Sequence, residues 1–448
     1  MTAQTQNSSL PRTSLWRALF VLTVGFTAPA VLGTWAQAQT FNDIFDFSLQ
    51  AGWSPYSGVT RDNAGNLYGT TNGALVDAGT VYELKRSHGG WILHVLFSFN
   101  PLSASSEVVG WAPYSGVVFG PDGALYGTTV GGGVGGGSNG YGVVYKLMPP
   151  ATVCESVSCP WTETVLYEFQ GHNDGSAPEY GNVVFDRAGN LYGTTTAGGG
   201  TGCQGSGCGT VYKLSPSGSG WTEQVLYRFA GGTDGAGPTS AVVLDAAGNL
   251  YGTTTAGGSA ACSGGCGTVY ELSPSGSGWT ERLLYTFQNG SDGESPFAGL
   301  TFDQSGNLYG ATFTGGSAGG GTVFQLSPHG QDWSFSTLYS FTPGGYGPYG
   351  PLENLAIDAA GSLYGTTYLD GGTDGAGSVF KLAPHNGEWT FTTLFTFPAG
   401  GLGDPYGQNP IGGPTVDSFG NIYGTTSEGG TQSCEFEIQC GVVWEITP

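Results

Sequence analysis

Short apolar runs alternate with glycine-rich turn segments along most of the chain. One clear example contains four runs of four to six residues, at 299–303, 307–312, 321–326 and 338–341. Each run is bounded by Gly, Asn, Ser, Asp or Pro, which is typical of β-strands joined by tight turns. The pattern predicts four strands, named A to D in chain order, that form one antiparallel sheet.

The second run contains a motif that recurs seven times, first as Gly-Asn-Leu-Tyr-Gly-Thr-Thr at 65–71. Successive copies are 55 to 66 residues apart, so each repeat has room for one four-stranded unit. Repeats of this kind bury their apolar faces against their neighbours. The motif tyrosines are Tyr68, Tyr126, Tyr192, Tyr251, Tyr309, Tyr364 and Tyr423.

The two ends of the chain share one repeat. The seventh copy of strand C ends two residues before the C-terminus, so its strand D is missing, and a matching segment lies at 43–47. A closed ring uses both chain ends in one sheet and leaves no open sheet edge, whereas a solenoid gives no reason to share a strand. We therefore predict an all-β fold, a seven-bladed β-propeller of four-stranded blades closed by the N-terminal strand.

Alternation of strand direction sorts the loops onto two faces. The A–B and C–D turns lie on one face and are short and similar between repeats. The D–A and B–C loops lie on the other face and vary in length and composition. Variable loops on a rigid scaffold are where binding is usually found, so the second face is the candidate site.

The first 38 residues have the features of a signal peptide: basic residues near the start, an apolar stretch at 18–33 and small residues at 36–38. Cleavage would leave a propeller at 39–448, secreted or periplasmic in a bacterium. An uncleaved membrane anchor is the alternative.

The first 38 residues contain two arginines and no acid, so their removal changes the net charge from −22 to −24. Such a surface disfavours nucleic acid and anionic membranes. We expect a monomer without membrane insertion after cleavage.

The eight cysteines occur in four close pairs, which predicts local disulfides in an exported chain. Zinc is the alternative, but no histidine stands at ligand spacing beside any pair. The predicted pairs are Cys154 with Cys159, Cys203 with Cys208, Cys262 with Cys266, and Cys434 with Cys440.

Acidic residues recur in the variable loops. Asp174, Asp234 and Asp292 each follow strand D by the same spacing and each precede a glycine, and Asp404 and Asp374 lie in loops of the same face. Such carboxylates could converge on a hard cation such as Ca²⁺. The alternative is that Asp-Gly simply forms a turn.

Two tryptophans lie in the first two D–A loops. Trp53 and Trp111 offer flat faces that could stack on a sugar ring, although packing within or between blades is the alternative role. These tryptophans and the five acids above are the candidate ligand-binding residues.

The sequence offers no catalytic set. None of the five histidines has a repeated Ser, Cys or carboxylate companion that would form a nucleophile and base. The recurring acids of the A–B turns are interpreted as turn residues. These acids are Asp62, Asp186, Asp245, Asp303, Asp358 and Asp417.

The tandem motif at 65–71, followed by Gly-Gly and by Gly-Thr-Val-Tyr-Glu-Leu, resembles the GloVer-type repeat of bacterial extracellular proteins. The resemblance covers about 41–448. It supplies no catalytic residues, and this chain lacks the C-terminal apolar segment and basic tail of anchored members, which implies a soluble exported product. The Asp-x-x-Gly-Asn-Leu-Tyr turn is also similar, more loosely, to that of sensor-type and NHL-type propellers.

Three functions are compatible with the sequence. The first is a non-catalytic extracellular binding module for carbohydrate or a surface polymer. The second is a polysaccharide lyase or glycoside hydrolase, which predicts paired carboxylates, or a Tyr with His and Arg, in one cleft of the variable face. The third is a structural cell-envelope protein, which predicts no concave pocket and no ion dependence.

Overall fold

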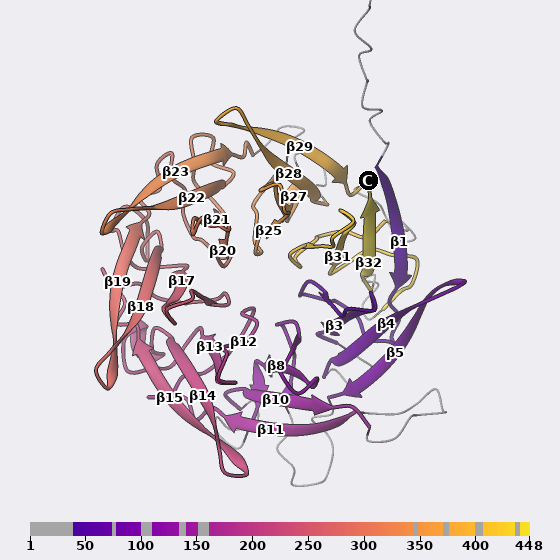
Figure 1. Ribbon diagram of the computed structural model, residues 1–448, viewed down its shortest axis with the longest axis horizontal. Coiled ribbons are helices and arrows are strands. Elements are labelled where there is room, and N and C mark those ends of the chain that lie inside the picture. Colours follow the sequence, from indigo (N-terminus) through magenta and orange to yellow (C-terminus); the bar gives the residue numbers. More distant parts are fainter. Residues whose placement is uncertain are drawn as a thin grey trace, which may run out of the picture. The chain divides into compact units, whose positions relative to one another are not determined.

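Seven four-stranded antiparallel sheets follow one another around a ring (Figure 1). The structure is a computed structural model and describes residues 39–73, 78–99, 110–133, 140–150, 161–343, 348–370, 376–398, 406–434 and 440–448. These residues belong to one compact unit, Gln39–Pro448. The predicted seven-bladed propeller is confirmed.

Each blade runs from a short inner strand A to a long outer strand D. Strands A are β2 (Thr60–Arg61), β7 (Val118–Phe119), β12 (Val184–Phe185), β16 (Val243–Leu244), β20 (Thr301–Phe302), β25 (Ala356–Ile357) and β30 (Thr415–Val416). Strands B are β3 (Leu67–Thr71), β8 (Leu125–Thr129), β13 (Leu191–Thr195), β17 (Leu250–Thr254), β21 (Leu308–Thr312), β26 (Leu363–Thr367) and β31 (Ile422–Thr426).

The outer half of each blade is a pair of longer antiparallel strands, which in the last blade come from the two ends of the chain. Strands C are β4 (Thr80–Ser87), β10 (Val143–Met148), β14 (Thr210–Ser217), β18 (Thr268–Ser275), β22 (Thr322–His329), β28 (Ser378–His385) and β32 (Val442–Thr447). Strands D are β5 (Gly90–Ser98), β11 (Thr162–Glu168), β15 (Gly220–Arg228), β19 (Gly278–Thr286), β23 (Asp332–Ser340), β29 (Glu388–Thr396) and β1 (Thr40–Asp46).

Small elements in the loops complete the described structure. Two minor sheets pair β6 (Gly110–Trp111) with β9 (Gly131–Gly132), and β24 (Pro348–Tyr349) with β27 (Leu369–Asp370). A single 3-10 turn is described, η1 (Cys203–Gly205). Within the described ranges, no helix has the length and apolar character needed to cross a membrane.

Strand B is buried along its whole length in every blade because both of its faces contact protein. Its glycine allows a close contact with the aromatic residue of strand C: a Cβ added at Gly69 would collide with the Tyr82 hydroxyl. In the last blade the Trp444 ring covers Gly424 in the same way. The motif glycine is therefore required by packing.

The apolar core lies between neighbouring blades. One cluster joins Tyr68 of the first blade to Leu125 and Tyr145 of the second, and the other clusters repeat this arrangement around the ring. The ring of Tyr68 meets Phe119 of the next blade edge to face at 5.0 Å. The motif tyrosine therefore packs between neighbouring blades, and each blade needs its neighbours to bury its core.

The ring closes as predicted. Strand β1 pairs antiparallel with β32, with Phe45 opposite Val443. Figure 1 shows β1 at the N-terminal end of the described chain beside the C-terminal strand β32. Phe41 of β1 also stacks on Phe395 of the preceding blade, with ring centroids 3.7 Å apart.

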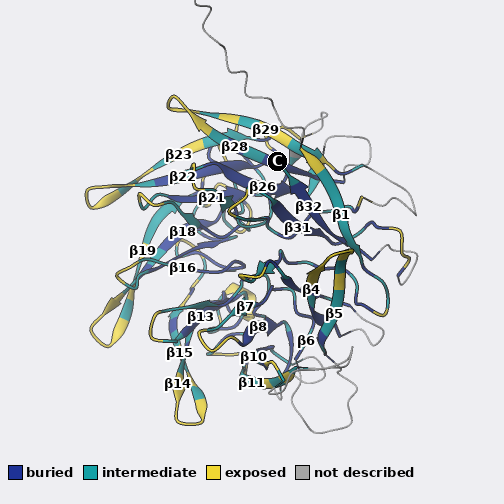
Figure 2. Ribbon diagram, turned by 45° about the vertical axis from the view of Figure 1, so that its right-hand side comes forward, coloured by how far each residue is buried: buried dark blue, intermediate teal, exposed yellow. Residues whose placement is uncertain are grey.

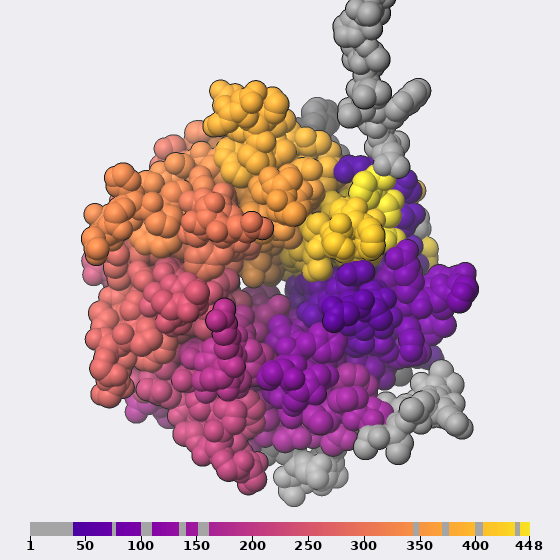
Figure 3. Space-filling view, in the orientation of Figure 1, coloured from indigo at the N-terminus to yellow at the C-terminus, as the bar shows by residue number. Residues whose placement is uncertain are grey.

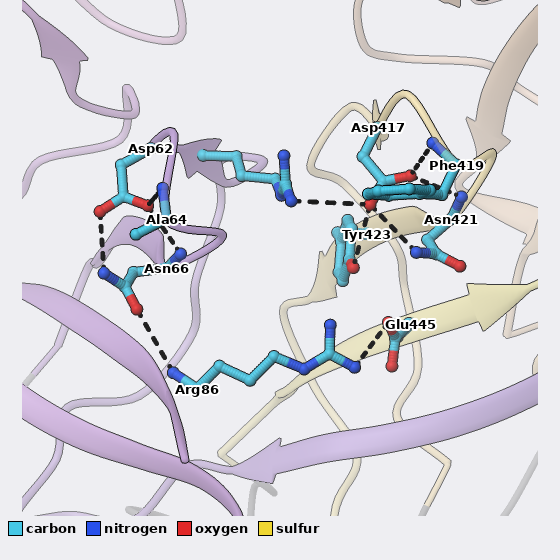
Figure 4. A network of polar contacts seen from close by, with 10 residues as sticks. Asp62, Ala64, Asn66, Arg86, Asp417, Phe419, Asn421, Tyr423 and Glu445 are labelled. Carbon is cyan, nitrogen blue, oxygen red and sulfur yellow. Dashed lines mark hydrogen bonds and ion pairs between the residues drawn. The ribbon is translucent and has the colours of Figure 1, made fainter. Parts of the chain in front are cut away.

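Polar contacts cross the same junction (Figure 4). The guanidinium of Arg86 on β4 lies 4.0 Å from the Glu445 carboxylate on β32. Arg61 on β2 lies 3.8 Å from the Asp417 carboxylate, which also accepts hydrogen bonds from its own turn. First and last blades are thus joined by a shared sheet and by charge.

Strand A is shorter than the sequence predicted. The run expected at 299–303 contributes only Thr301–Phe302 to its sheet. The preceding residues instead turn across the inner end of the blade. Figure 2 shows exposed tips of C–D hairpins, among them those of β14–β15, β18–β19 and β22–β23, which project from the rim.

Candidate functional site

One position of the repeat surrounds the central channel. It lies 12 residues before the motif tyrosine and four residues before strand A in all seven blades. A proline stands next to it, or two residues before it in the third blade, and fixes the approach of the chain. We call these residues the mouth ring. They are Tyr56, Tyr114, Tyr180, Thr239, Phe297, Leu352 and Ile411.

Aromatic side chains form a continuous arc on one side of the mouth ring. The Tyr56 and Tyr114 ring centroids are 5.0 Å apart, and those of Tyr114 and Tyr180 are 5.5 Å apart. On another side, Phe297 meets Phe313 edge to face at 5.8 Å. Most of these side chains are only half-buried, so apolar surface faces the channel.

The mouth ring encloses a cavity of about 200 Å³. Six of its seven residues line the cavity, together with Tyr368 and Glu353. Because strand A leads away from this point toward the A–B turns, the cavity opens toward the face of the D–A and B–C loops. Figure 3 shows a hollow at the centre of the ring.

A second cavity of about 330 Å³ lies along the inner strands. It shares Tyr180 and Glu353 with the first and adds the polar side chains of Asn182 and Asn354. Each of these asparagines accepts a hydrogen bond from a backbone N–H of the preceding blade, at 2.7 Å from Gly116 and 2.6 Å from Gly299. The two cavities are successive parts of one channel, apolar at the mouth and more polar below.

Glu353 is the exception in a ring of small residues. It lies three residues before strand A, where the other blades have Ser57, Ser115, Gly181, Ser240, Ala298 and Gly412. Its side chain is partly exposed, but to the channel. Burial raises the pKa of the Glu353 carboxyl from its ordinary 4.5 to about 8, and the backbone N–H of Asn354 offsets this only in part.

The tyrosine hydroxyls of the channel are also in a desolvated environment. Burial raises the pKa of Tyr56 and of Tyr180, and neighbouring tyrosines and carboxylates raise both further. These phenols therefore stay protonated at neutral pH and act as hydrogen-bond donors rather than bases.

Two other hollows lie on the opposite face. Grooves of about 510 and 380 Å³ separate the A–B turns of the third and fourth blades and of the fifth and sixth blades. They are larger than the mouth cavity, but the same turn residues line both. They follow from the repeat itself, so the mouth cavity is the stronger candidate site.

The loop acids Asp174, Asp234 and Asp292 hold their own loops. Each carboxylate accepts a hydrogen bond from a tyrosine hydroxyl of its own strand D, at 2.8, 2.6 and 3.1 Å respectively. Each also accepts one from a backbone N–H four residues earlier. No three His, Cys, Asp or Glu side chains of the described residues come together in a group that could hold a metal ion. Calcium binding by these acids stays a prediction.

Trp53 and Trp111 lie farther out on the same face. Trp53 pairs by backbone hydrogen bonds with Gly73, and Trp111 lies on the two-stranded ribbon opposite Gly131. Each indole ring covers its partner glycine, where a Cβ would collide with it. Both side chains are half-buried and contact the core clusters between blades, so packing is at least part of their role.

Three of the predicted disulfides are confirmed, all in B–C loops: Cys203–Cys208, Cys262–Cys266 and Cys434–Cys440. They indicate an oxidising extracellular or periplasmic environment. The predicted pair Cys154 and Cys159 and the candidate acids Asp374 and Asp404 lie outside the described residues.

The A–B turn acids are structural, as interpreted. Asp186 accepts hydrogen bonds from the backbone N–H groups of Ala188 and Asn190, both at 2.9 Å, and from the hydroxyl of Tyr192 at 3.0 Å. The other turns repeat this network. In the second blade Gly120 stands in the place of the acid, and Asp122, two residues farther along a turn of the same length, accepts the hydrogen bond of the Tyr126 hydroxyl, so the sequence pattern did not reveal it.

A family model matches the repeats that form these blades. The Gloeobacter/Verrucomicrobia repeat model matches residues 79–278, 134–342 and 259–448, which together cover most of the chain. The chain belongs to this family. The predicted resemblance to the GloVer-type repeat is thereby confirmed, and a search of curated proteins gave no match.

Three solved structures match this chain of Gloeobacter/Verrucomicrobia repeats at low sequence identity. The polysaccharide lyase Uly1 is 11% identical, with a TM-score of 0.50 and coverage of 93% of this chain and 94% of the lyase. An oxidoreductase (glucose dehydrogenase) of Thermus thermophilus is 15% identical, with a TM-score of 0.42 and coverage of 79% and 99%. PorZ, a surface component of the type-IX secretion system of Porphyromonas gingivalis, is 14% identical, with a TM-score of 0.48 and coverage of 85% and 46%.

The mouth ring and Glu353 were missed from the sequence. A signal was present, because the ring has a constant offset from the motif tyrosine in all seven Gloeobacter/Verrucomicrobia repeats. The residue types at this position vary between repeats, however. The prediction therefore rested on the more conspicuous Trp and Asp-Gly positions of the loops.

Proposed function

We propose that this protein is a non-catalytic extracellular binding module that takes a carbohydrate or another surface polymer at the mouth of its central channel. The mouth ring is the observation that carries the proposal. Half-buried aromatic and aliphatic side chains around a concave cavity, with a few polar groups, are typical of ligand sites. The rim of the site extends over the loops that carry Trp53 and Trp111.

The size of the cavity supports recognition of one terminal group. A volume of about 200 Å³ is below the roughly 300–1,000 Å³ typical of sites that enclose a whole ligand. One sugar residue or headgroup would enter, while the rest of a polymer lies on the open face. Aromatic faces at the mouth suit the apolar side of a sugar ring.

The chemistry of the lining favours binding over catalysis. Glycoside hydrolysis usually needs two carboxyl groups, and among the described residues the mouth cavity is lined by one, Glu353. A base for a lyase needs a lowered pKa, whereas those of Tyr56 and Tyr180 are raised. The likeness to a polysaccharide lyase concerns the fold, and fold does not imply activity.

The charge of the molecule further limits the class of ligand that is expected. A net charge of −22 and a carboxyl in the channel disfavour anionic polysaccharides such as uronic-acid polymers. Neutral or amine-bearing glycans are therefore expected. A structural envelope protein would have no reason to keep such a cavity open.

Binding to a panel of neutral, acidic and amine-bearing oligosaccharides tests the proposal. We expect Phe297→Ala and Tyr180→Ala to weaken binding of the best oligosaccharide about tenfold or more, because each removes an aromatic face. Phe419→Ala is the control, since Phe419 is 78% exposed at an A–B turn of the opposite face. Equal loss in all three variants, or binding of no member of the panel, would contradict the proposal. Repeating the binding measurements with a chelator tests whether binding depends on calcium held by Asp174, Asp234 and Asp292.

A further inference from the structure

We propose that the channel mouth binds an organic ammonium group, with Glu353 as its counter-charge and Tyr56, Tyr180, Phe297 and Tyr368 as its aromatic walls. The inference rests on the proposed use of this cavity and specifies the group that enters it. An amino sugar or an alkylammonium substituent of a surface polymer has this chemistry.

The first support is the position of Glu353. Six blades have Ser, Gly or Ala at the corresponding position, and none of these side chains is long enough to reach far into the channel. The remaining blade, the sixth, carries a carboxyl that lines both parts of the channel. The repeat itself therefore does not require an acid here, because the other blades form the same junction without one.

The second support is that Glu353 has no basic partner among the described residues. No Lys, Arg or His lines the mouth cavity. Arg61 lines the lower cavity, but its guanidinium is paired with Asp417 at 3.8 Å. An enclosed carboxyl without a cation is costly when ionised, so a cationic ligand would compensate it.

The third support is the aromatic wall. Tyr56, Tyr180, Phe297 and Tyr368 all line the cavity that Glu353 enters. Aromatic faces attract an ammonium group through the negative charge of their π-systems, and cages of this kind bind quaternary ammonium ligands. A carboxyl alone would also accept a small inorganic cation, but hydrophobic walls favour an alkylated one.

The fourth support is volume. A cavity of about 200 Å³ is smaller than the roughly 300–1,000 Å³ of sites that enclose a drug-sized ligand. That space holds a trimethylammonium group or one small ring. Titratable groups that face Glu353 in the mouth are the hydroxyls of Tyr56, Tyr180 and Tyr368. Burial raises the pKa of Tyr56 and of Tyr180, so both stay neutral near pH 7.

The pH dependence of binding has a definite sign. Since the pKa of Glu353 in the empty channel is about 8, the carboxyl is mainly protonated below that pH. Binding of a cation then requires loss of a proton. Affinity for an ammonium ligand should rise between pH 6 and about pH 8.5 and then level off.

Titration calorimetry with choline and with its neutral isostere 3,3-dimethylbutan-1-ol tests the inference on the whole propeller. We expect choline to bind more tightly than the isostere, by about tenfold at pH 8.5. Glu353→Gln should remove this preference and its pH dependence while leaving the isostere unaffected. Glu281→Gln on β19, which changes another half-buried carboxyl outside the channel, is the matched control.

The outcomes separate the two proposals. Equal affinity of wild type and Glu353→Gln for choline, or choline affinity that does not change with pH, overturns the ammonium inference. Absence of choline binding with retained binding of a neutral oligosaccharide also overturns it and leaves the proposed function standing. Binding of choline without binding of any oligosaccharide overturns the proposed carbohydrate ligand instead.

Discussion

At the scale of single residues, the first threonine of the motif joins neighbouring blades. In the fourth blade, the hydroxyl of Thr253 donates to the backbone carbonyl of Ala298 in the fifth, at 3.0 Å. Four other junctions have the same bond. The fifth blade has Ala311 in this position, and the Thr366 hydroxyl in the sixth has no partner. The motif therefore carries a stabilising contact that is absent at two junctions.

Replacing Thr253 by Val should lower the free energy of unfolding by about 1–2 kcal/mol, because a buried carbonyl loses its donor while the shape of the side chain is kept. Thr366→Val is the matched control and should be neutral or slightly stabilising, since its hydroxyl is buried without a partner. Urea unfolding followed by tryptophan fluorescence measures both. Similar effects of the two changes would show that the hydroxyl bond is unimportant.

At the scale of elements, closure depends on β1. Phe47 follows β1 directly, is fully buried, and its ring meets Tyr82 of the first blade edge to face at 5.1 Å. Its backbone N–H donates to the Gly441 carbonyl just before β32. A residue from the start of the chain thus fastens the last blade to the first.

Phe47→Ala should cost about 3–5 kcal/mol, because it removes a fully buried aromatic side chain and leaves a cavity at the closing junction. The control Phe419→Ala removes the same atoms from an exposed turn and should change the free energy of unfolding by about 0.5 kcal/mol or less. Thermal and urea unfolding midpoints measure the difference. A cost for Phe47→Ala no larger than that of the control would contradict closure through β1 as a source of stability.

At the scale of the whole molecule, two sets of carboxyl groups respond to pH in opposite directions. Burial raises the pKa of one set, to about 7 for Asp43, Glu223 and Glu281, and hydrogen bonds within the turns lower the pKa of the other set despite the opposing effect of burial. The raised set also includes Glu179 and Glu353. The lowered set is Asp122, Asp186, Asp303 and Asp358.

The unfolding temperature should therefore be highest at about pH 4–5, between the pH range in which the lowered set loses its contribution and the range in which the raised set does. A raised pKa contributes stability that is present below the unfolded value and is lost as the pH rises through about 7 to 8. A lowered pKa contributes stability that is lost as the pH falls below about 4. Calorimetric scans from pH 3 to pH 9 measure the curve.

Matched variants test which carboxyl groups cause the unfolding temperature to fall as the pH rises. Glu223→Gln together with Glu281→Gln should flatten the fall between about pH 5 and pH 7, because the amides do not ionise. Glu388→Gln, at an exposed hairpin tip, should leave it unchanged. If the unfolding temperature falls as steeply in the double variant as in the wild type, these buried carboxyls are not the cause of the fall.

The sequence by itself determined the blades, their number and the closure of the ring. It could do so because strand length, turn residues and the count of Leu-Tyr-Gly-Thr motifs are local properties, and closure followed from one missing strand. The disulfides between close cysteines were predictable for the same reason. The role of Asp174 was harder to predict from the sequence. An acid that accepts hydrogen bonds within its own loop and an acid that binds a cation have the same spacing along the chain.

Only the tertiary structure decided what faces the channel. Tyr56 and Tyr180 are separated by two blades in the sequence, and their proximity to Glu353 depends on how seven short strands meet around one axis. Whether a side chain is desolvated depends on neighbours from several blades, so the raised pKa of Glu353 has no sequence signature. Local periodicity set the scaffold, while long-range packing set the site.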